Sequence, residues 1–149
     1  MVKILFVCHG NICRSPMAEF VMKKLVKDAG LDSKIAVDSC ATSREEIGND
    51  MYPPAKQKLR EKGVPFAKRA ARQITKADYA AADYVVAMDR YNLRNLDRVL
   101  GGDPDGKISL LLSHAGRSAD ISDPWYTDDF ESTYRDVLEG CSALLEALK

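Results

Sequence analysis

Short apolar runs and amphipathic segments with helical spacing alternate along this chain of 149 residues. The apolar runs at 2–7, 35–37, 83–88 and 108–112 are continuous, as expected of strands that are buried on both faces. The clearest helical segment covers 130–148, and its apolar positions are Phe130, Tyr134, Val137, Leu138, Cys141, Leu144, Leu145 and Leu148. This alternation predicts an α/β fold with one domain, residues 1–149, in which a four-stranded parallel sheet is flanked by helices on both faces.

Residues that typically start helices lie at the ends of the apolar runs. Ser15 and Pro16 suit the start of a helix that runs to about residue 29, because Ser caps a helix and Pro needs no N–H donor at its first position. Pro53 opens a helix over 55–62, and Asp89 caps the helix that follows the third strand. The first strand, a loop and the first helix therefore follow one another within the first 30 residues.

Composition and charge exclude several classes of function. The chain is 46% hydrophobic and 30% charged, and its formal net charge is zero, so we expect neither a nucleic-acid partner nor an anionic membrane partner. No apolar run approaches the roughly 20 residues that span a bilayer, and the four-residue apolar run before Cys8 is too short for a signal peptide. We therefore expect a cytoplasmic protein.

The cysteines indicate neither a disulfide framework nor a metal site. There are 4 of them in 149 residues, and they lack the Cys-x₂-Cys spacing of zinc sites; they are Cys8, Cys13, Cys40 and Cys141. Only His9 and His114 could join them as ligands. We expect no metal and no cofactor.

The loop between the first strand and the first helix carries the candidate chemistry. It lies at a helix N-terminus, where free N–H groups and the helix dipole favour an anion. Gly10 lets the backbone turn closely and Asn11 tolerates left-handed geometry. The same donors would lower the pKa of the Cys8 thiol, and the Arg14 guanidinium can bind two phosphate oxygens. A nucleophile beside a fixed cation in an anion site predicts phosphoryl transfer.

The segment Cys8-His9-Gly10-Asn11-Ile12-Cys13-Arg14-Ser15-Pro16-Met17-Ala18-Glu19 resembles the signature of the low-molecular-weight protein tyrosine phosphatases. The resemblance extends over essentially the whole chain, including Ala71-Arg72-Gln73-Ile74-Thr75 and Ala87-Met88-Asp89. It implies the strand order 2-1-3-4. It also implies a metal-independent phosphatase that acts on phosphotyrosine-containing proteins or small aryl phosphates and releases inorganic phosphate.

The resemblance also implies the catalytic roles. Cys8 attacks phosphorus, Arg14 binds the phosphoryl oxygens, and Ser15 donates a hydrogen bond to the sulfur. The leaving oxygen needs a proton, and the family carries its general acid in an Asp-Pro loop before the last helix. Asp123 matches that position, and Pro124 should hold it in an extended conformation. A reversible Cys8–Cys13 disulfide is a further implication.

Substrate contacts are expected around this loop. The expected substrate-binding residues are His9, Gly10, Asn11, Ile12, Cys13, Ser15, Glu45, Trp125 and Tyr126. His9 replaces an apolar residue of the family and should line the pocket mouth. Glu45 lies where eukaryotic members offer an aromatic side chain, and Trp125 replaces a Tyr. Relatives that act on phosphoarginine carry Thr at the position of Ile12, so Ile12 favours phosphotyrosine.

Three alternatives remain open at this point. Cys8 could be a small buried residue at a strand end, with Arg14 on a solvated helix start. Thioredoxin-coupled arsenate reduction uses a similar loop but needs a further cysteine pair to relay a disulfide, and Cys40 and Cys141 are far apart in the chain. A catalytically silent phosphate-binding module could discard Cys8 or Asp123, yet this chain retains both.

Overall fold

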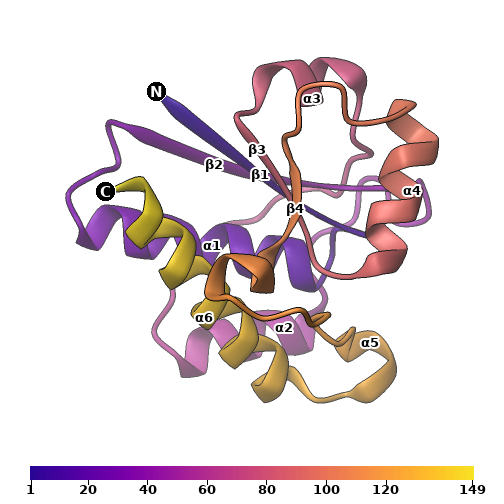
Figure 1. Cartoon of the computed structure of the whole chain (residues 1–149). Coiled ribbons are helices and arrows are strands. Elements are labelled where there is room, and N and C mark those ends of the chain that lie inside the picture. The colour runs from indigo at the N-terminus through magenta and orange to yellow at the C-terminus, as the bar shows by residue number, and fades with distance from the viewer.

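A computed structural model describes residues 1–149 as alternating strands and helices (Figure 1). In chain order the strands and α-helices are β1 (Val2–Cys8), α1 (Arg14–Asp28), β2 (Ile35–Ala41), α2 (Pro53–Glu61), α3 (Lys76–Ala81), β3 (Tyr84–Ala87), α4 (Arg90–Leu100), β4 (Ile108–Leu110), α5 (Pro124–Thr127) and α6 (Phe130–Leu148). A 3₁₀ helix, Leu111–Ala115, directly follows β4.

The four strands form one parallel sheet in the predicted order, β2-β1-β3-β4. In the register of the central strand β1, Val7 lies beside Cys40 of β2 and Ala87 of β3. The chain leaves both β1 and β3 at the same edge of the sheet. That edge is where open α/β sheets bind ligands.

The side chains of β1 alternate between two apolar cores, one on each face of the sheet. Ile4 and Phe6 belong to the larger core, together with residues of α1, α2 and α6. Leu5 and Val7 belong to the smaller core, together with residues of α3 and α4. Figure 1 shows α3 and α4 on one side of the strands and α1, α2 and α6 on the other. The predicted α/β class with helices on both faces is confirmed.

Two predicted strand boundaries are wrong. β2 continues to Ala41 because it pairs with β1 as far as Cys8, and its exposed Asp38 is tolerated on an edge strand. β4 ends at Leu110, where its pairing with β3 ends at Ala87. The next two residues, predicted as strand, belong to the 3₁₀ helix.

Two predictions around the helices are also corrected. The first helix begins at Arg14, with Cys13 at its cap position, and Ser15 does not cap it because the Ser15 hydroxyl lies beside the Cys8 sulfur. Pro16 is the third helical residue, which is harmless because the first four N–H groups of a helix have no partner within it. The loop expected at Asp123 contains the short helix α5.

None of the helices combines the length and the apolar character that crossing a bilayer requires.

Candidate active site

The candidate site is built at the end of β1, where the loop from Cys8 to Ser15 enters α1. The Cys8 sulfur accepts hydrogen bonds from the backbone N–H groups of Asn11 and Ser15, at 3.3 and 3.4 Å. The Ser15 hydroxyl oxygen lies 3.0 Å from the same sulfur. These contacts surround the sulfur with hydrogen-bond donors. The expected thiolate at Cys8 stays a prediction.

Several other donors of this loop have no partner. The backbone N–H groups of Gly10, Ile12, Cys13 and Arg14 donate no hydrogen bond within the protein. Because they precede or open α1, its dipole adds partial positive charge at the same place. The loop is therefore prepared to receive the oxygens of an anion such as phosphate.

Asn11 gives the loop its shape. Its φ of 60° is left-handed, as predicted, whereas Gly10 does not have a positive φ. Gly10 instead allows a close approach, because a Cβ at this position would lie 3.3 Å from Cγ of Glu46. The buried Asn11 side chain donates to the hydroxyls of Ser15 and Ser39, at 2.8 and 3.0 Å. These bonds fix the Ser15 hydroxyl beside the sulfur.

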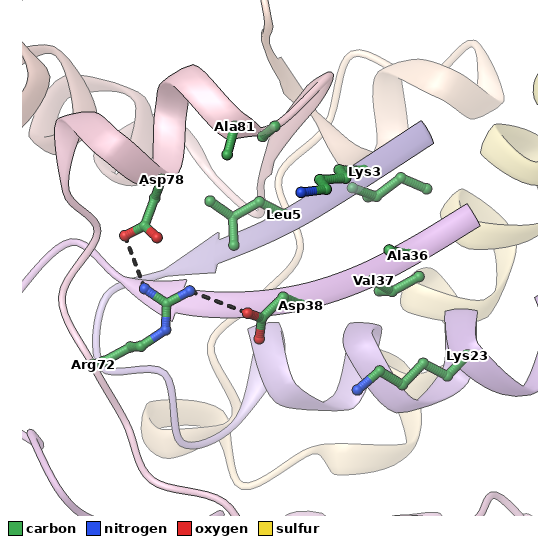
Figure 2. A pocket seen from close by; sticks show the side chains of 11 residues that line it. Lys3, Leu5, Lys23, Ala36, Val37, Asp38, Arg72, Asp78 and Ala81 are labelled. Carbon is green, nitrogen blue, oxygen red and sulfur yellow. Dashed lines mark hydrogen bonds and ion pairs between the residues drawn. The ribbon is translucent and has the colours of Figure 1, made fainter. Parts of the chain in front are cut away.

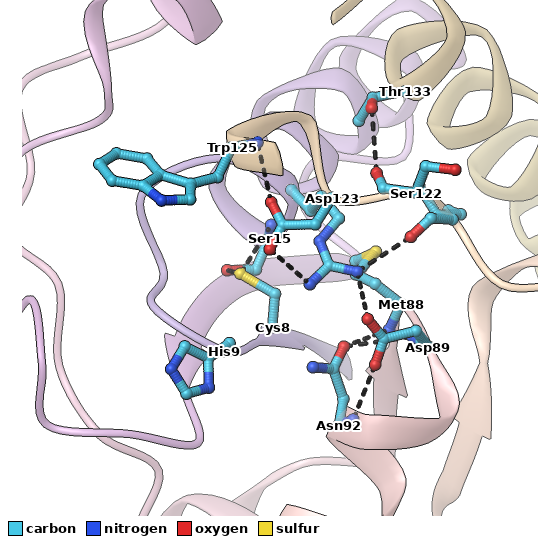
Figure 3. Close-up of polar contacts among 12 residues, drawn as sticks. Cys8, His9, Ser15, Met88, Asp89, Asn92, Ser122, Asp123, Trp125 and Thr133 are labelled. Atoms are coloured by element: carbon cyan, nitrogen blue, oxygen red, sulfur yellow. Dashed lines mark hydrogen bonds and ion pairs between the residues drawn. The ribbon is translucent and has the colours of Figure 1, made fainter. Parts of the chain in front are cut away.

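The Arg14 guanidinium is held by Asp89 and Asp123, two side chains that reach the site from different parts of the chain (Figure 3). Its Nη1 donates to Asp89 at 2.6 Å and to the carbonyl oxygen of Ile121 at 2.9 Å, and Nη2 donates to Asp123 at 3.3 Å. Burial opposes its charge, but nearby Cys8, Asp123 and Asp89 more than offset this, so the pKa of Arg14 is raised. The guanidinium is a fixed, permanently charged group beside the sulfur.

Asp123 approaches the pocket from the segment before α6. Its φ of −81° and ψ of 111° are extended, as Pro124 predicted. One carboxylate oxygen accepts the Trp125 N–H at 3.1 Å and thereby caps α5, while the other contacts Arg14. The preceding residue, Ser122, is tied to α6 because its carbonyl oxygen accepts a hydrogen bond from Thr133.

The structure brings most of the predicted site residues to one cleft of about 120 Å³. The predicted residues that line it are Cys8, His9, Gly10, Ile12, Cys13, Arg14, Glu45, Asp123, Trp125 and Tyr126. Asn11 and Ser15 do not line this cleft, because both are fully buried. Their contacts are with the loop and the sulfur, so they shape the site from behind.

The rim of the cleft combines one polar pair with exposed aromatic side chains. His9 Nε2 lies 2.8 Å from the Glu45 carboxylate, so these two predicted rim residues contact each other. Trp125 is half exposed and packs on Tyr52, with ring centroids 4.8 Å apart. Tyr126 is largely exposed. Trp125 and Tyr126 are thus the two aromatic side chains that line the cleft.

The other three cysteines are buried thiols. All four are free, and burial raises the pKa values of Cys13, Cys40 and Cys141. Cys40 and Cys141 belong to the two different apolar cores, on opposite faces of the sheet. Neither borders the cleft.

Asp89 is the main site residue that sequence reasoning missed. It was expected only as a helix cap, and it does cap α4, because it accepts the Asn92 N–H at 2.8 Å. The same carboxylate binds Arg14. Its position directly after β3, next to β1 in the sheet, is the signal that could have identified it. Nothing in the sequence indicated that Glu46 or the carbonyl group of Ile121 would lie at the site.

A larger hollow of about 470 Å³ lies over β1 and β2, beside α3 (Figure 2). Its arginine, Arg72, is bonded to Asp78 at 2.8 Å and to Asp38 at 3.1 Å. It contains no cysteine, histidine or serine that could act as a nucleophile. The candidate chemistry is therefore at the Cys8 cleft and not in this hollow.

Comparison with known proteins gives the same assignment. The family model described as "Low molecular weight phosphotyrosine protein phosphatase" matches residues 3–149. The chain is 38% identical to the low molecular weight protein-tyrosine-phosphatase YfkJ of Bacillus subtilis, over 100% of this chain and 97% of that one. It is 43% identical to the human low molecular weight phosphotyrosine protein phosphatase, over 96% and 93% of the two chains.

Solved structures agree. The crystal structure of YfkJ superimposes with a TM-score of 0.95 over 99% of this chain and 94% of that one. That of a Drosophila arginine phosphatase, 34% identical, gives a TM-score of 0.88 over 99% and 98%. The chain therefore belongs to the low molecular weight phosphotyrosine protein phosphatase family.

Proposed function

We propose that this chain hydrolyses phosphotyrosine in proteins, and small aryl phosphates, without a metal ion, and that residues 1–149 form the phosphatase domain. The observation that carries the proposal is the Cys8 sulfur beside unpaired backbone N–H groups, with Arg14 and Asp123 on the same cleft. Such a site supplies a nucleophile, a cradle for the transferred phosphoryl group and a proton donor.

In the first step the Cys8 thiolate attacks phosphorus. The S–P bond forms while the bond from phosphorus to the tyrosine oxygen breaks, and Asp123 gives its proton to that oxygen. Arg14 and the loop N–H groups bind the three non-bridging oxygens as their charge redistributes. The product is tyrosine, and a cysteinyl-phosphate remains on the enzyme.

In the second step water attacks the phosphorus and passes a proton to Asp123. The S–P bond breaks, inorganic phosphate leaves, and Cys8 returns as thiolate. The Ser15 hydroxyl, 3.0 Å from the sulfur, donates a hydrogen bond that stabilises the departing thiolate. Asp123 is again protonated for the next cycle.

Arg14 links substrate binding to the state of Asp123. Nη2 of Arg14 donates to Asp123, whereas Nη1 is occupied by Asp89 and Ile121. A bound phosphoryl group competes for Nη2. The Asp123 oxygen that loses this donor is then free to carry the proton that the leaving group needs.

Phosphotyrosine is favoured over phosphoarginine by the apolar wall of the cleft. Ile12 and Trp125 both line it and offer apolar surface to an aromatic ring. A relay of the arsenate-reductase kind is disfavoured, because Cys40 and Cys141 are buried on opposite faces of the sheet.

Hydrolysis of p-nitrophenyl phosphate in the presence of a chelator tests this proposal. We expect turnover by the wild type, none by Cys8→Ser, and retention of vanadate binding by that variant. A phosphotyrosine peptide should be hydrolysed faster than a phosphoarginine peptide. Strict dependence on an added metal ion, or turnover by Cys8→Ser, would contradict the proposal.

A further inference from the structure

A second groove, of about 640 Å³, adjoins the catalytic cleft and has no role in the chemistry described above. It shares His9, Arg14, Asp123 and Tyr126 with that cleft, so the two are continuous. Its remaining lining comes from the start of α4 and from the segment on either side of Asp123: Asp89, Tyr91, Asn92, Asn95, Asp120, Ile121, Ser122 and Thr127. We call it the flanking groove.

A polypeptide substrate must cross the surface around the catalytic cleft. Only the phosphotyrosine side chain can enter a cleft of about 120 Å³, so the residues beside it in the sequence lie outside. The flanking groove opens directly from the cleft and is several times larger. A bound peptide therefore has a preformed channel on this side.

The charges of the flanking groove are unbalanced. Its only lysine or arginine is Arg14, which is buried and already bonded to Asp89 and Asp123. The exposed Asp120 carboxylate makes no hydrogen bond and no ion pair in the structure. A carboxylate without a partner, beside a pocket for a phosphate dianion, disfavours acidic neighbours of the phosphotyrosine and favours basic ones.

Two aromatic side chains of the groove also favour a positively charged residue of the substrate. Tyr91 and Tyr126 both line the groove and are largely exposed. The Arg94 guanidinium already lies over the Tyr91 ring, 4.5 Å from its centroid, which shows a cation on a ring at this place. The Tyr126 ring has no such cation and remains free for one.

We propose that the flanking groove binds the substrate polypeptide beside the phosphotyrosine and selects a lysine or arginine there, through Asp120 and the Tyr126 ring. This inference rests on the proposed phosphatase activity. An exposed ion pair and an exposed cation–π contact are each weak, so the preference should be about threefold to tenfold in kcat/KM. It should also shrink as salt screens the exposed charge.

The test compares phosphotyrosine peptides that differ at one position. One series carries Lys and a matched series carries Glu, at each of the three positions on either side of the phosphotyrosine. With the wild type, Lys should give the higher kcat/KM on one side of the phosphotyrosine. The preference should fall in Asp120→Asn to the part that the Tyr126 ring supplies, and it should reverse toward Glu in Asp120→Lys.

Asp97→Asn is the matched control, because Asp97 is an exposed acid of α4 that does not line the groove. It should retain the full preference. Equal rates for the Lys and Glu peptides, or a preference that is undiminished in Asp120→Asn, would overturn the inference while turnover of phenyl phosphate upheld the proposed function. Absence of turnover on phenyl phosphate by the wild type would overturn both.

Discussion

At the scale of single residues, Arg14 is held by groups from two distant parts of the chain, the Asp89 carboxylate and the Ile121 carbonyl oxygen. Cys8 and Arg14 could be proposed because their spacing placed both in a loop at a helix N-terminus. The partners of Arg14 could not be found in this way, since Asp89 and Ile121 are brought to it only by the strand order and by the return of the chain before α6. His9 and Glu45 were each expected near the substrate, but their mutual contact depends on the loop that follows β2.

The role of Asp123 as proton donor to the leaving group can be tested by replacing its carboxyl group with an amide. Asp123→Asn keeps the shape of the side chain but cannot donate the carboxylic proton. Hydrolysis of phenyl phosphate should fall by about 10²- to 10⁴-fold, the usual contribution of a general acid. The loss should be much smaller for p-nitrophenyl phosphate, whose leaving group departs without a proton. Steady-state kinetics with both substrates measures the difference.

Asp128→Asn is the control for this prediction. Asp128 is nearby and its φ of 59° is left-handed, a conformation that Asn also adopts. It should stay near wild type with both substrates. An equal loss of kcat/KM on both substrates in Asp123→Asn would show that Asp123 is not the proton donor, because kcat/KM reports the step in which the leaving group departs.

At the scale of elements, apolar periodicity predicted the central parts of the strands and helices. It did not predict where several of these elements begin or end. The end of β2 depends on pairing with β1 beyond an exposed Asp38, and the end of β4 depends on where β3 stops. The start of α1 is set by the anion loop, in which Ser15 turns to the Cys8 sulfur. These ends are decided by tertiary contacts that local sequence does not contain.

Helix α4 links the sheet to the site through Asp89, which caps the helix and binds Arg14. Asp89→Asn should preserve the cap, because Asn caps helices as well as Asp, but it removes the charge paired with Arg14. We expect kcat/KM for phenyl phosphate to fall about tenfold to a hundredfold, through displacement of the guanidinium. The free energy of unfolding should also fall, by roughly 1–3 kcal/mol, because the buried Arg14 charge loses one of its two carboxylate partners.

Asp78→Asn separates this positioning role from a general structural one. Asp78 also binds an arginine, Arg72, and also stabilises a helix start, but at α3 and away from the cleft. It should lose stability and keep its turnover per folded molecule. Asp89→Asn with wild-type kinetics would refute the positioning role of Asp89.

At the scale of the whole molecule, α6 holds the segment that carries Asp123 against the rest of the fold. Gly140 of α6 packs so closely on the 3₁₀ helix that a Cβ there would lie 2.5 Å from Cγ of Leu111 and 3.1 Å from its carbonyl oxygen. Gly140→Ala should therefore destabilise the protein, because overpacking costs about 1–3 kcal/mol and exceeds the helix propensity gained. Denaturant unfolding measures this.

Ser142→Ala, a half-buried position of the same helix, is the comparison for that measurement. It should leave the free energy of unfolding nearly unchanged or slightly higher. If Gly140→Ala is more stable than the wild type, the contact between α6 and the 3₁₀ helix can accommodate the added methyl group at little cost.

The phosphoryl group should pass through the Cys8 sulfur, and a trapping experiment can detect it there. Asp123→Asn should be mixed with p-nitrophenyl phosphate, quenched within the first turnover, and digested for mass spectrometry. We expect one added phosphoryl group on the peptide that contains Cys8, and none in Cys8→Ser. If turnover occurs with no phosphoryl group on Cys8 at any time, or with a phosphoryl group on a different residue, Cys8 is not the nucleophile.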